Sequence, residues 1–206
     1  MKPTHSIESI LGSRSRVAVL RVLVGVTIPL NTSQIAAHAR LTRPAVASVL
    51  EDLAAGGIVR SSPAGRANVH QLERRNIYVE RLIEPLFAAE QQMPDHLESD
   101  LRAAFEDSSP SIVLFGSYAR GEQETGSDVD VVLVTADVGS KKDLDRRLLS
   151  YAQEFRARYG ANLSAITYEA READALWRTA PAFLESLRRD AVVVSGRGPW
   201  EWADDE

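Results

Sequence analysis

The sequence predicts an α+β protein built from two domains, and three observations lead to this prediction. Between residues 13 and 72, apolar residues recur at helical spacing and then give way to two short strand-like runs. Later, a buried strand, a tight Gly116-Ser117 turn and a second strand with two aspartates follow one another. Charge also divides the chain, because residues 1–75 hold ten Lys and Arg against four Asp and Glu, although the net charge is −5. The two parts are therefore expected to have different partners.

The first domain is expected over residues 1–75, as three helices followed by a hairpin. The helices are predicted over Ser13–Val24, over Gln34–Ala39, and from Thr42 to the double glycine Gly56-Gly57. Thr42 is expected to cap the third helix, with Pro44 in its first turn, where the missing N–H does no harm. Two strands, Ile58–Ser61 and Ala67–Leu72, are predicted on either side of a turn-rich loop over residues 62–66.

The run from Thr32 to Arg66 resembles bacterial winged helix-turn-helix regulators. It has two short helices, a turn and a Leu-x-x-Leu-x-x-x-Gly-Ile-Val ending at Val59. The resemblance implies that the third helix enters the major groove of double-stranded DNA and that the wing reaches phosphates or the minor groove. The residues expected to face DNA are Thr42, Arg43, Ala45 and Ser48, with Arg40, Arg60 and Arg66 available for phosphates. A module for protein contacts or dimerisation is the alternative, but the positive charge favours DNA.

Residues 76–94 are expected to connect the domains. Apolar residues recur on one face of a predicted helix over residues 76–90, and a separate helix is predicted after Met93-Pro94-Asp95, with the domain boundary near Pro94. A homodimer is expected, in which the helix over residues 76–90 is one candidate for pairing with its copy. Packing in an ordinary core is the alternative.

The second domain is expected over residues 95–198, as a small mixed sheet with flanking helices. The predicted strands are 111–115, 128–134, 162–168 and 191–195, and the predicted helices are 117–122, 141–158, 169–177 and 181–189. Residues 199–206 form an acidic tail that is expected to be poorly ordered.

The turn at Gly116-Ser117 and the Asp128-Val-Asp130 run together indicate phosphate and metal chemistry. Glycine lets the backbone approach a ligand closely, and the Ser117 hydroxyl can donate to a phosphate oxygen. Side chains alternate along a strand, so both carboxylates point to one face while Val129 enters the core. Two neighbouring carboxylates repel each other unless a cation lies between them, and hard oxygen ligands beside a phosphate suit Mg²⁺.

These residues resemble the nucleotidyltransferase superfamily, whose signature is Gly-Ser, about ten residues, then Asp-x-Asp. The sequences Ala119-Arg120-Gly121 and Ser127-Asp128 fit its fuller form in the minimal bacterial members. The resemblance implies transfer of a nucleoside monophosphate from a nucleoside triphosphate, with Mg²⁺, to an acceptor that is a protein, an RNA or a small molecule. It implies that Asp128, Asp130 and Ser117 are catalytic, that Asp128 and Asp130 bind the metal, and that Gly116, Ser117, Arg120 and Ser127 bind the nucleotide.

Active relatives have a third carboxylate on a neighbouring strand, and the corresponding run here, residues 162–168, contains no acid. Asn162 or Ser164 is expected at that position, unless Glu169, Glu172 or Asp137 reaches in from a loop. A neutral ligand would bind Mg²⁺ more weakly and supply no general base. The alternative function is therefore a catalytically weak or inactive regulator, or an antitoxin-like repressor.

Composition excludes several other classes of protein. With 44% apolar and 26% charged residues, the chain is typical of soluble globular proteins. It has neither a membrane-spanning apolar run nor a signal-peptide pattern, so a cytoplasmic location is expected. The absence of cysteine excludes disulfides, and the four histidines are scattered, so no zinc site is expected.

Overall fold

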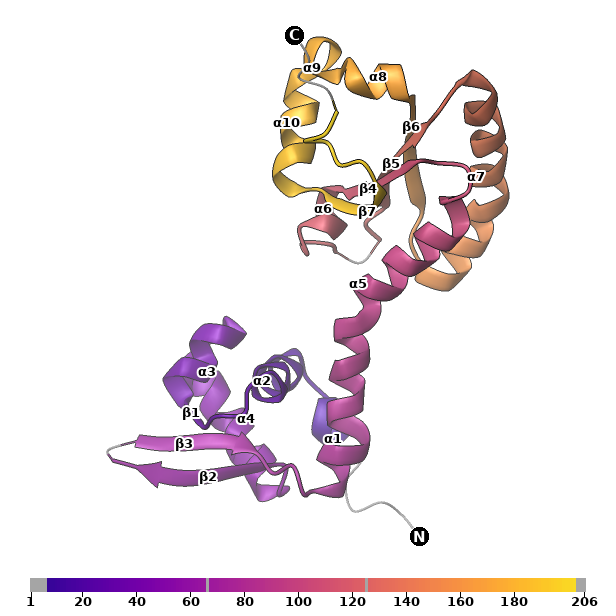
Figure 1. Cartoon of the computed structure of the whole chain (residues 1–206). Helices are drawn as coiled ribbons and strands as arrows, with labels where there is room; N and C mark the ends of the chain where they lie inside the picture. The colour runs from indigo at the N-terminus through magenta and orange to yellow at the C-terminus, as the bar shows by residue number, and fades with distance from the viewer. Residues whose placement is uncertain (1–6, 66, 125, 203–206) are drawn as a thin grey trace. The chain divides into compact units, whose positions relative to one another are not determined.

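The computed structural model describes residues 7–65, 67–124 and 126–202 (Figure 1). The chain divides into two compact units, Met1–Met93 and Pro94–Glu206. No helix in the described part of the chain has the length and hydrophobicity that crossing a bilayer would need. Both units combine helices with a sheet, which confirms the predicted α+β class.

The first unit is a winged helix. Its elements are, in order, α1 (Ile7–Leu11), α2 (Arg14–Val24), β1 (Leu30–Asn31), α3 (Thr32–Ala39), α4 (Arg43–Ala55), β2 (Val59–Ala64), β3 (Ala67–Leu72), the π-helical turn η1 (Val79–Ile83) and the start of α5 (Glu84–Phe105). The three strands form an antiparallel sheet in the order β1-β3-β2. The β2–β3 hairpin is the wing, and α4 occupies the place of the recognition helix.

Capping and apolar spacing explain where the three main helices of this unit lie. The Ser13 side chain accepts from the Arg16 backbone N–H and caps α2, while Asn31 and Gln34 form a capping box at the start of α3. Along α4, Val46, Val49, Leu50 and Leu53 are buried. These features confirm the helices predicted from the sequence, whereas α1 and the two-residue strand β1 were not predicted.

The wing has longer strands than predicted. β2 continues through Pro63 to Ala64, so most of the expected loop over residues 62–66 is strand, and Pro63 pairs with Asn68. Proline cannot donate to a ladder, but the strand order places β2 at the edge of the sheet, where a missing donor is tolerated. Arg66, expected at the tip, lies outside the described residues.

The expectation of two helices on either side of Pro94 is wrong, because α5 is a single helix of 22 residues with Pro94 inside it. A proline in a helix interior costs about 3 kcal/mol. Burial at both ends of the helix offsets this cost. Phe87 belongs to the core of the first unit, and Leu101 and Phe105 belong to a core of the second. Residues 88–96, around the proline, are all exposed.

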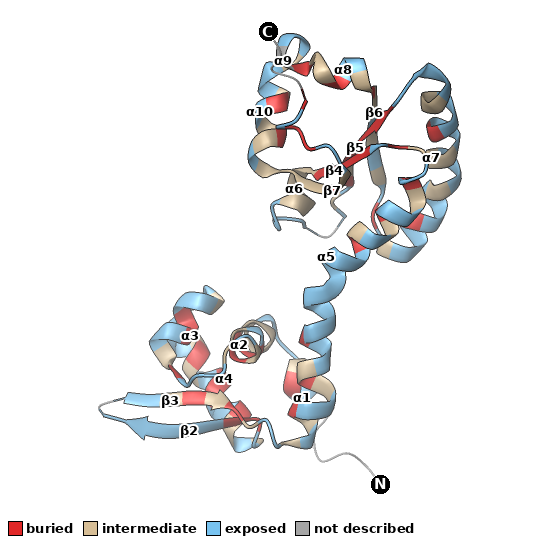
Figure 2. Ribbon diagram, in the orientation of Figure 1, coloured by how far each residue is buried: buried red, intermediate tan, exposed pale blue. Residues whose placement is uncertain are grey.

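The second unit is a mixed four-stranded sheet with helices on both faces (Figure 1). Its elements after α5 are β4 (Ser111–Phe115), α6 (Gly116–Ala119), β5 (Val129–Thr135), α7 (Val138–Tyr159), β6 (Leu163–Glu169), α8 (Ala170–Asp174), α9 (Leu176–Thr179), α10 (Pro181–Asp190) and β7 (Val192–Gly196). The strand order is β6-β5-β4-β7; β6 runs parallel to β5, and the other pairs are antiparallel. Figure 2 shows that β4 and β5, in the middle of the sheet, are almost entirely buried.

Two cores lie on opposite faces of this sheet. Val129, Val131 and Leu133 of β5 pack with α7 and the C-terminal part of α5. Val132 and Val134 face the other way and pack with residues of α8, α9 and α10. This alternation is the direct result of the two-residue period of a strand.

The prediction of a poorly ordered tail is wrong for residues 199–202. Trp202 is only 1% exposed and belongs to the core on the α10 side. The Arg188 side chain donates to the backbone oxygens of Pro199 and Trp202, at 3.2 and 3.3 Å. A large aromatic side chain thus holds the segment, despite its acidic composition.

Candidate active site

A tight turn joins β4 to α6 at Gly116. The φ angle of Gly116 is +74°, in the left-handed region that residues with a side chain rarely adopt. A β-carbon at this position would also overlap the carboxylate of Asp130. Glycine is therefore required both by the backbone conformation and by the closeness of the acid. The half-buried Ser117 follows in the first turn of α6.

Strand register places Asp130 beside this turn. β4 and β5 are antiparallel, and Phe115, the residue before the turn, is opposite Asp130. Val129 and Val131 are fully buried on the α7 side, so Asp130 between them faces the other side. Asp128 immediately precedes β5 and is exposed. The structure thus brings Asp130 to the glycine turn, with Asp128 two residues before it.

The neighbouring strand β6 brings two polar residues to the aspartates. In the parallel β5–β6 register, Asp130 is opposite Ser164, and the pair Val129–Leu163 sets Asp128 beside Asn162. The Asn162 amide nitrogen donates to Asp128 Oδ1 at 3.0 Å. Both residues weighed for the missing third carboxylate therefore flank the site, and Asn162 is the one that contacts an aspartate. The β5–β6 register distinguishes the two residues, and that register comes from the folded sheet.

The three acids considered as alternatives to a carboxylate on β6 do not reach the site. Glu169 is opposite Thr135, at the other end of β5 from Asp130 and about 16 Å away at the usual rise per strand residue. Glu172 forms a capping box with Glu169 at the start of α8 and an ion pair with Lys141. Asp137 caps α7, and hydrogen bonds from Ser140 lower the pKa of its carboxyl. All three acids instead cap the N-termini of α7 or α8.

Arg120 and Ser127, both expected to bind nucleotide, have local partners. Arg120 is exposed and donates to Glu122 Oε2 at 2.7 Å. It also lies close enough to Asp190 to help lower the pKa of that carboxyl, although hydrogen bonds from Arg189 lower it most. The Ser127 hydroxyl accepts from the Glu124 N–H at 3.0 Å and closes the turn that leads into Asp128.

Residues 97–180 match the family model of the nucleotidyltransferase domain. This range holds the glycine turn, both aspartates and Asn162, and the match supports the nucleotidyltransferase-like domain expected from the motif. Two proteins of Methanocaldococcus jannaschii, both named "Putative protein adenylyltransferase", are similar to part of this chain. One is 39% identical over 80 residues, which are 38% of this chain and 54% of that protein. The other is 29% identical over 72 residues, 35% of this chain and 72% of that protein. The chain therefore spans only about half the length of the first relative.

Two solved structures show a weaker likeness. The first, described as the toxin-antitoxin with AMP-PNP, is 19% identical, covers 48% of this chain and 73% of that chain, and has a TM-score of 0.33. The second, the adhesin competence repressor of Streptococcus pyogenes, is 9% identical, covers 72% of this chain and 84% of that chain, and has a TM-score of 0.34. At these TM-scores, neither likeness supports a conclusion about function.

The donor set beside the glycine turn fits a magnesium ion. Mg²⁺ in phosphate-transfer sites is commonly held by one or two carboxylates together with substrate phosphates. Asp128 and Asp130 supply two carboxylates at alternate positions beside a turn that a phosphate can approach. Among the described residues, no group of three His, Cys, Asp or Glu side chains could hold a metal ion. A magnesium ion held by these two carboxylates would take its remaining ligands from water and from the phosphates of a nucleotide.

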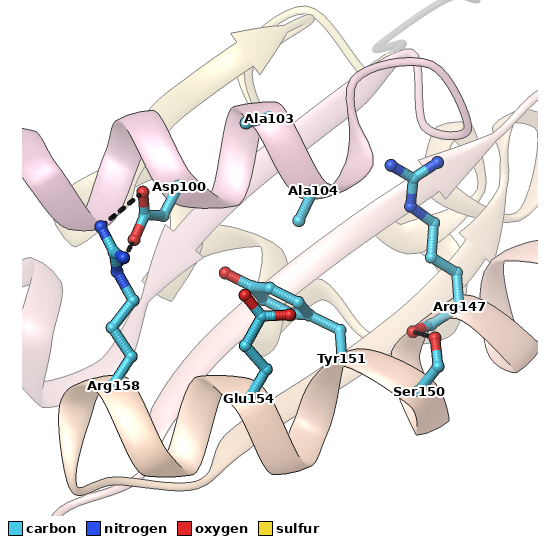
Figure 3. Close-up of a pocket in the computed structure, with 8 residues that line it drawn as sticks. All are labelled: Asp100, Ala103, Ala104, Arg147, Ser150, Tyr151, Glu154 and Arg158. Carbon is cyan, nitrogen blue, oxygen red and sulfur yellow. Dashed lines mark hydrogen bonds and ion pairs between the residues drawn. The ribbon is translucent and has the colours of Figure 1, made fainter.

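A separate pocket of about 520 Å³ lies between α5 and α7 (Figure 3). It is on the sheet face opposite to Asp130. Figure 3 shows Tyr151 at its floor and Asp100 paired with Arg158 across the two helices. Tyr159 also donates to Asp100, and mainly burial raises the pKa of Tyr159 to about 12. The pocket therefore lies where α5 and α7 are joined by an ion pair, and none of its lining residues belongs to the site around Asp128 and Asp130.

In the winged helix, the residues expected to meet DNA lie at the start of α4 and on the wing. Thr42, Arg43, Ser48 and Arg40 are exposed, and Ala45 is half-buried. Thr42 is the N-cap position of α4, but its side chain makes no capping hydrogen bond. Arg60, on β2, is within 4.0 Å of Glu73.

Proposed function

We propose that the nucleotidyltransferase domain transfers a nucleoside monophosphate from a nucleoside triphosphate to an acceptor, with Mg²⁺ as cofactor. One observation carries this proposal: the Asp130 carboxylate lies over Gly116, in a turn that only glycine fits. The Asp130 carboxylate thus lies beside backbone that has no side chain, so a cation bound to this carboxylate could also bind a phosphate that approaches the turn.

Asp128 and Asp130 hold the cation from the protein side. When bound there, Mg²⁺ neutralises phosphate charge and makes the α-phosphorus more electrophilic. The turn at Gly116 lets the β- and γ-phosphates approach the backbone, and the Ser117 hydroxyl donates to a phosphate oxygen. Arg120 exchanges its exposed partner Glu122 for the leaving pyrophosphate, while Ser127 holds the turn before Asp128.

The reaction is an in-line displacement at phosphorus. An acceptor hydroxyl oxygen attacks the α-phosphorus, and a new O–P bond forms as the bond to the bridging oxygen of the β-phosphate breaks. Pyrophosphate leaves with the electron pair of the broken bond. The hydroxyl proton passes to water, because no third carboxylate lies beside Asp128 and Asp130 in the described part of the chain. Positioning and charge neutralisation therefore supply most of the rate acceleration.

ATP and a hydroxyl side chain of a partner protein are the substrate and acceptor to test first. The names of the two Methanocaldococcus jannaschii relatives point to adenylyl transfer to protein. An RNA end is the other acceptor that this chemistry allows, since it also presents a hydroxyl.

The test is label transfer from α-labelled ATP, GTP, CTP or UTP in the presence of Mg²⁺, with protein and RNA fractions as acceptors. Replacing both aspartates (Asp128→Asn with Asp130→Asn) should lower transfer by at least ~10²-fold, because the charge that holds the cation is lost. Asp143→Asn is the matched control, since Asp143 is an exposed residue of α7 paired only with Arg146 among the described residues.

Label transfer that the double variant abolishes and the control retains supports the transferase. Tight nucleotide binding without transfer to any acceptor supports the alternative, a nucleotide-sensing regulator or antitoxin-like repressor. Transfer that survives in the double variant contradicts the assignment of the two aspartates.

A second function, binding of double-stranded DNA by the winged helix, is favoured by the charges at the start of α4. Five of the nine arginines that the structure describes in the first unit are neutralised: Arg16, Arg21, Arg60, Arg74 and Arg81 each pair with an acid. Arg40 and Arg43 are exposed, and no ion pair is formed by either within the described residues. Arg43 begins α4, the helix expected in the major groove, and Arg40 is the C-cap residue of α3. These two unneutralised cations favour contact with phosphates or a guanine edge.

Gel retardation of upstream DNA from the protein's own locus tests this function. Arg43→Ala should weaken binding about tenfold, within the ~1–3 kcal/mol expected for such a contact, and binding should fall steeply with salt. Arg81→Ala, an exposed and acid-paired arginine away from α4, is the control. If Arg43→Ala retards this DNA as well as the wild type and the Arg81→Ala control do, the winged helix is a protein-contact or homodimer module.

A further inference from the structure

Asp128 is exposed, yet its side chain is held in place by a residue of the neighbouring strand. The Val129 N–H donates to the backbone oxygen of Asn162 at 2.8 Å, which locks the start of β5 to the start of β6. From this position the Asn162 amide nitrogen donates to Asp128 Oδ1 at 3.0 Å. An exposed aspartate would otherwise sample several rotamers.

The chemistry of the contact fixes which end of the amide faces the acid. A carboxylate only accepts hydrogen bonds, so the NH₂ group of Asn162 must point at Asp128 and its carbonyl oxygen away. The hydrogen bond is made to Oδ1, and no described residue donates a side-chain hydrogen bond to Oδ2. An aspartate at position 162 would instead place a like charge beside Asp128 and raise its demand for a cation.

Ser164, the other polar residue on this part of β6, does not share the role. It is exposed and opposite Asp130 in register. Among the described residues, its side chain makes no hydrogen bond to either aspartate. The candidate site beside the glycine turn therefore contains the two carboxylates of Asp128 and Asp130 and one neutral hydrogen-bond donor, Asn162.

We propose that Asn162 is a positioning residue that orients Asp128 toward the cation and that keeps the site at two carboxylates, enough for one divalent cation at a time. This inference rests on the proposed nucleotidyl transfer. Groups that hydrogen-bond a metal ligand typically change metal affinity or activity 10–100-fold when removed. A site with two charges binds its cation weakly until a triphosphate adds its own oxygens, so metal and nucleotide bind cooperatively.

Two substitutions at position 162 act in opposite directions under this proposal. Asn162→Ala removes the hydrogen bond and frees the Asp128 side chain, so the dissociation constant for Mn²⁺ should rise at least tenfold. Asn162→Asp adds a third carboxylate, so the same constant should fall below that of the wild type. A residue that only stabilised the β5–β6 pair would weaken metal binding in both variants.

The experiment uses the full chain and measures Mn²⁺ binding by electron paramagnetic resonance, with and without a non-hydrolysable ATP analogue. Circular dichroism melting of each variant controls for folding, and Ser164→Ala should stay within about twofold of the wild type. Label transfer as a function of Mg²⁺ concentration is the second readout. In this assay, Asn162→Ala should need more Mg²⁺ and Asn162→Asp should need less.

Opposite shifts of the two variants support the proposal. It is overturned if Asn162→Ala binds Mn²⁺ as the wild type does, if both variants weaken binding equally, or if Ser164→Ala has the larger effect. If the variants give one of these results while the wild type transfers label, only the proposed role of Asn162 is wrong. A wild type that neither binds Mn²⁺ nor transfers label overturns the proposed function together with this inference.

Discussion

Replacing Gly116 with alanine separates the two reasons for a glycine at the β4–α6 turn. The first reason is the φ angle of +74°, a conformation that costs a residue with a side chain about 1–2 kcal/mol. The second is the Asp130 carboxylate, which a β-carbon at position 116 would overlap. Only the second reason concerns the candidate active site.

The structure shows how these two costs divide. The Asp130 side chain can rotate away, so the overlap adds little to the loss of stability, and the free energy of unfolding should fall by about 1–2 kcal/mol from backbone strain. To reach an ordinary contact distance, the carboxylate oxygen must move by about 1 Å. A displacement of that size in a reacting group costs on the order of 10²-fold in rate, equal to about 2.7 kcal/mol of transition-state stabilisation.

Gly160→Ala is the matched control. Gly160 has a φ of +67° at the end of α7, and a β-carbon there would meet no atom within 4 Å. Both variants should show similar losses in urea denaturation, but only Gly116→Ala should lose Mn²⁺ binding and label transfer from ATP. If Gly116→Ala and Gly160→Ala keep the same Mn²⁺ binding and label transfer, or lose them to the same extent, the close approach of Asp130 to the turn is not the basis of the site.

Two further predictions concern the cores of the two units. Trp202→Ala should lower the free energy of unfolding by about 3–5 kcal/mol in urea denaturation, because it empties a buried aromatic site; a loss below about 1 kcal/mol would show that Trp202 is not core. Burial lowers the pKa of His70, which lies between the hydroxyls of Thr32 and Ser61. The unfolded chain therefore takes up the proton first, so stability should be full above a pH of about 6.5 and decline as the pH falls through the folded pKa. His70→Gln should flatten this pH dependence in thermal unfolding, and an unchanged profile would contradict the assignment.

Local signals predict most elements of this protein because those elements depend on neighbours in the chain. The capping groups of α2 and α3 each contact a residue three positions away, and the buried residues of α4 follow one another at helical spacing. Such short separations along the chain can be recognised in the sequence. The missed elements depend on distant partners. β1 has only two residues and exists because it pairs with β3, in which His70, the partner of Leu30, comes forty residues later.

Proline was the least reliable local signal. Pro63 was expected in a loop and lies in a strand, because the strand order makes β2 an edge. Pro94 was expected to separate two helices and lies inside one, because each end of α5 is buried in a core of its own unit. In both cases packing elsewhere outweighed a local preference.

By itself, the sequence determined that a glycine turn and two alternate aspartates occur within one strand–turn–strand segment, since their spacing within the chain sets their faces. The tertiary structure alone decided that Asn162, 34 residues after Asp128, is the residue that contacts it. The physical reason is strand register: a shift of one residue along β6 would turn every side chain to the other face, and only the packed sheet sets that register.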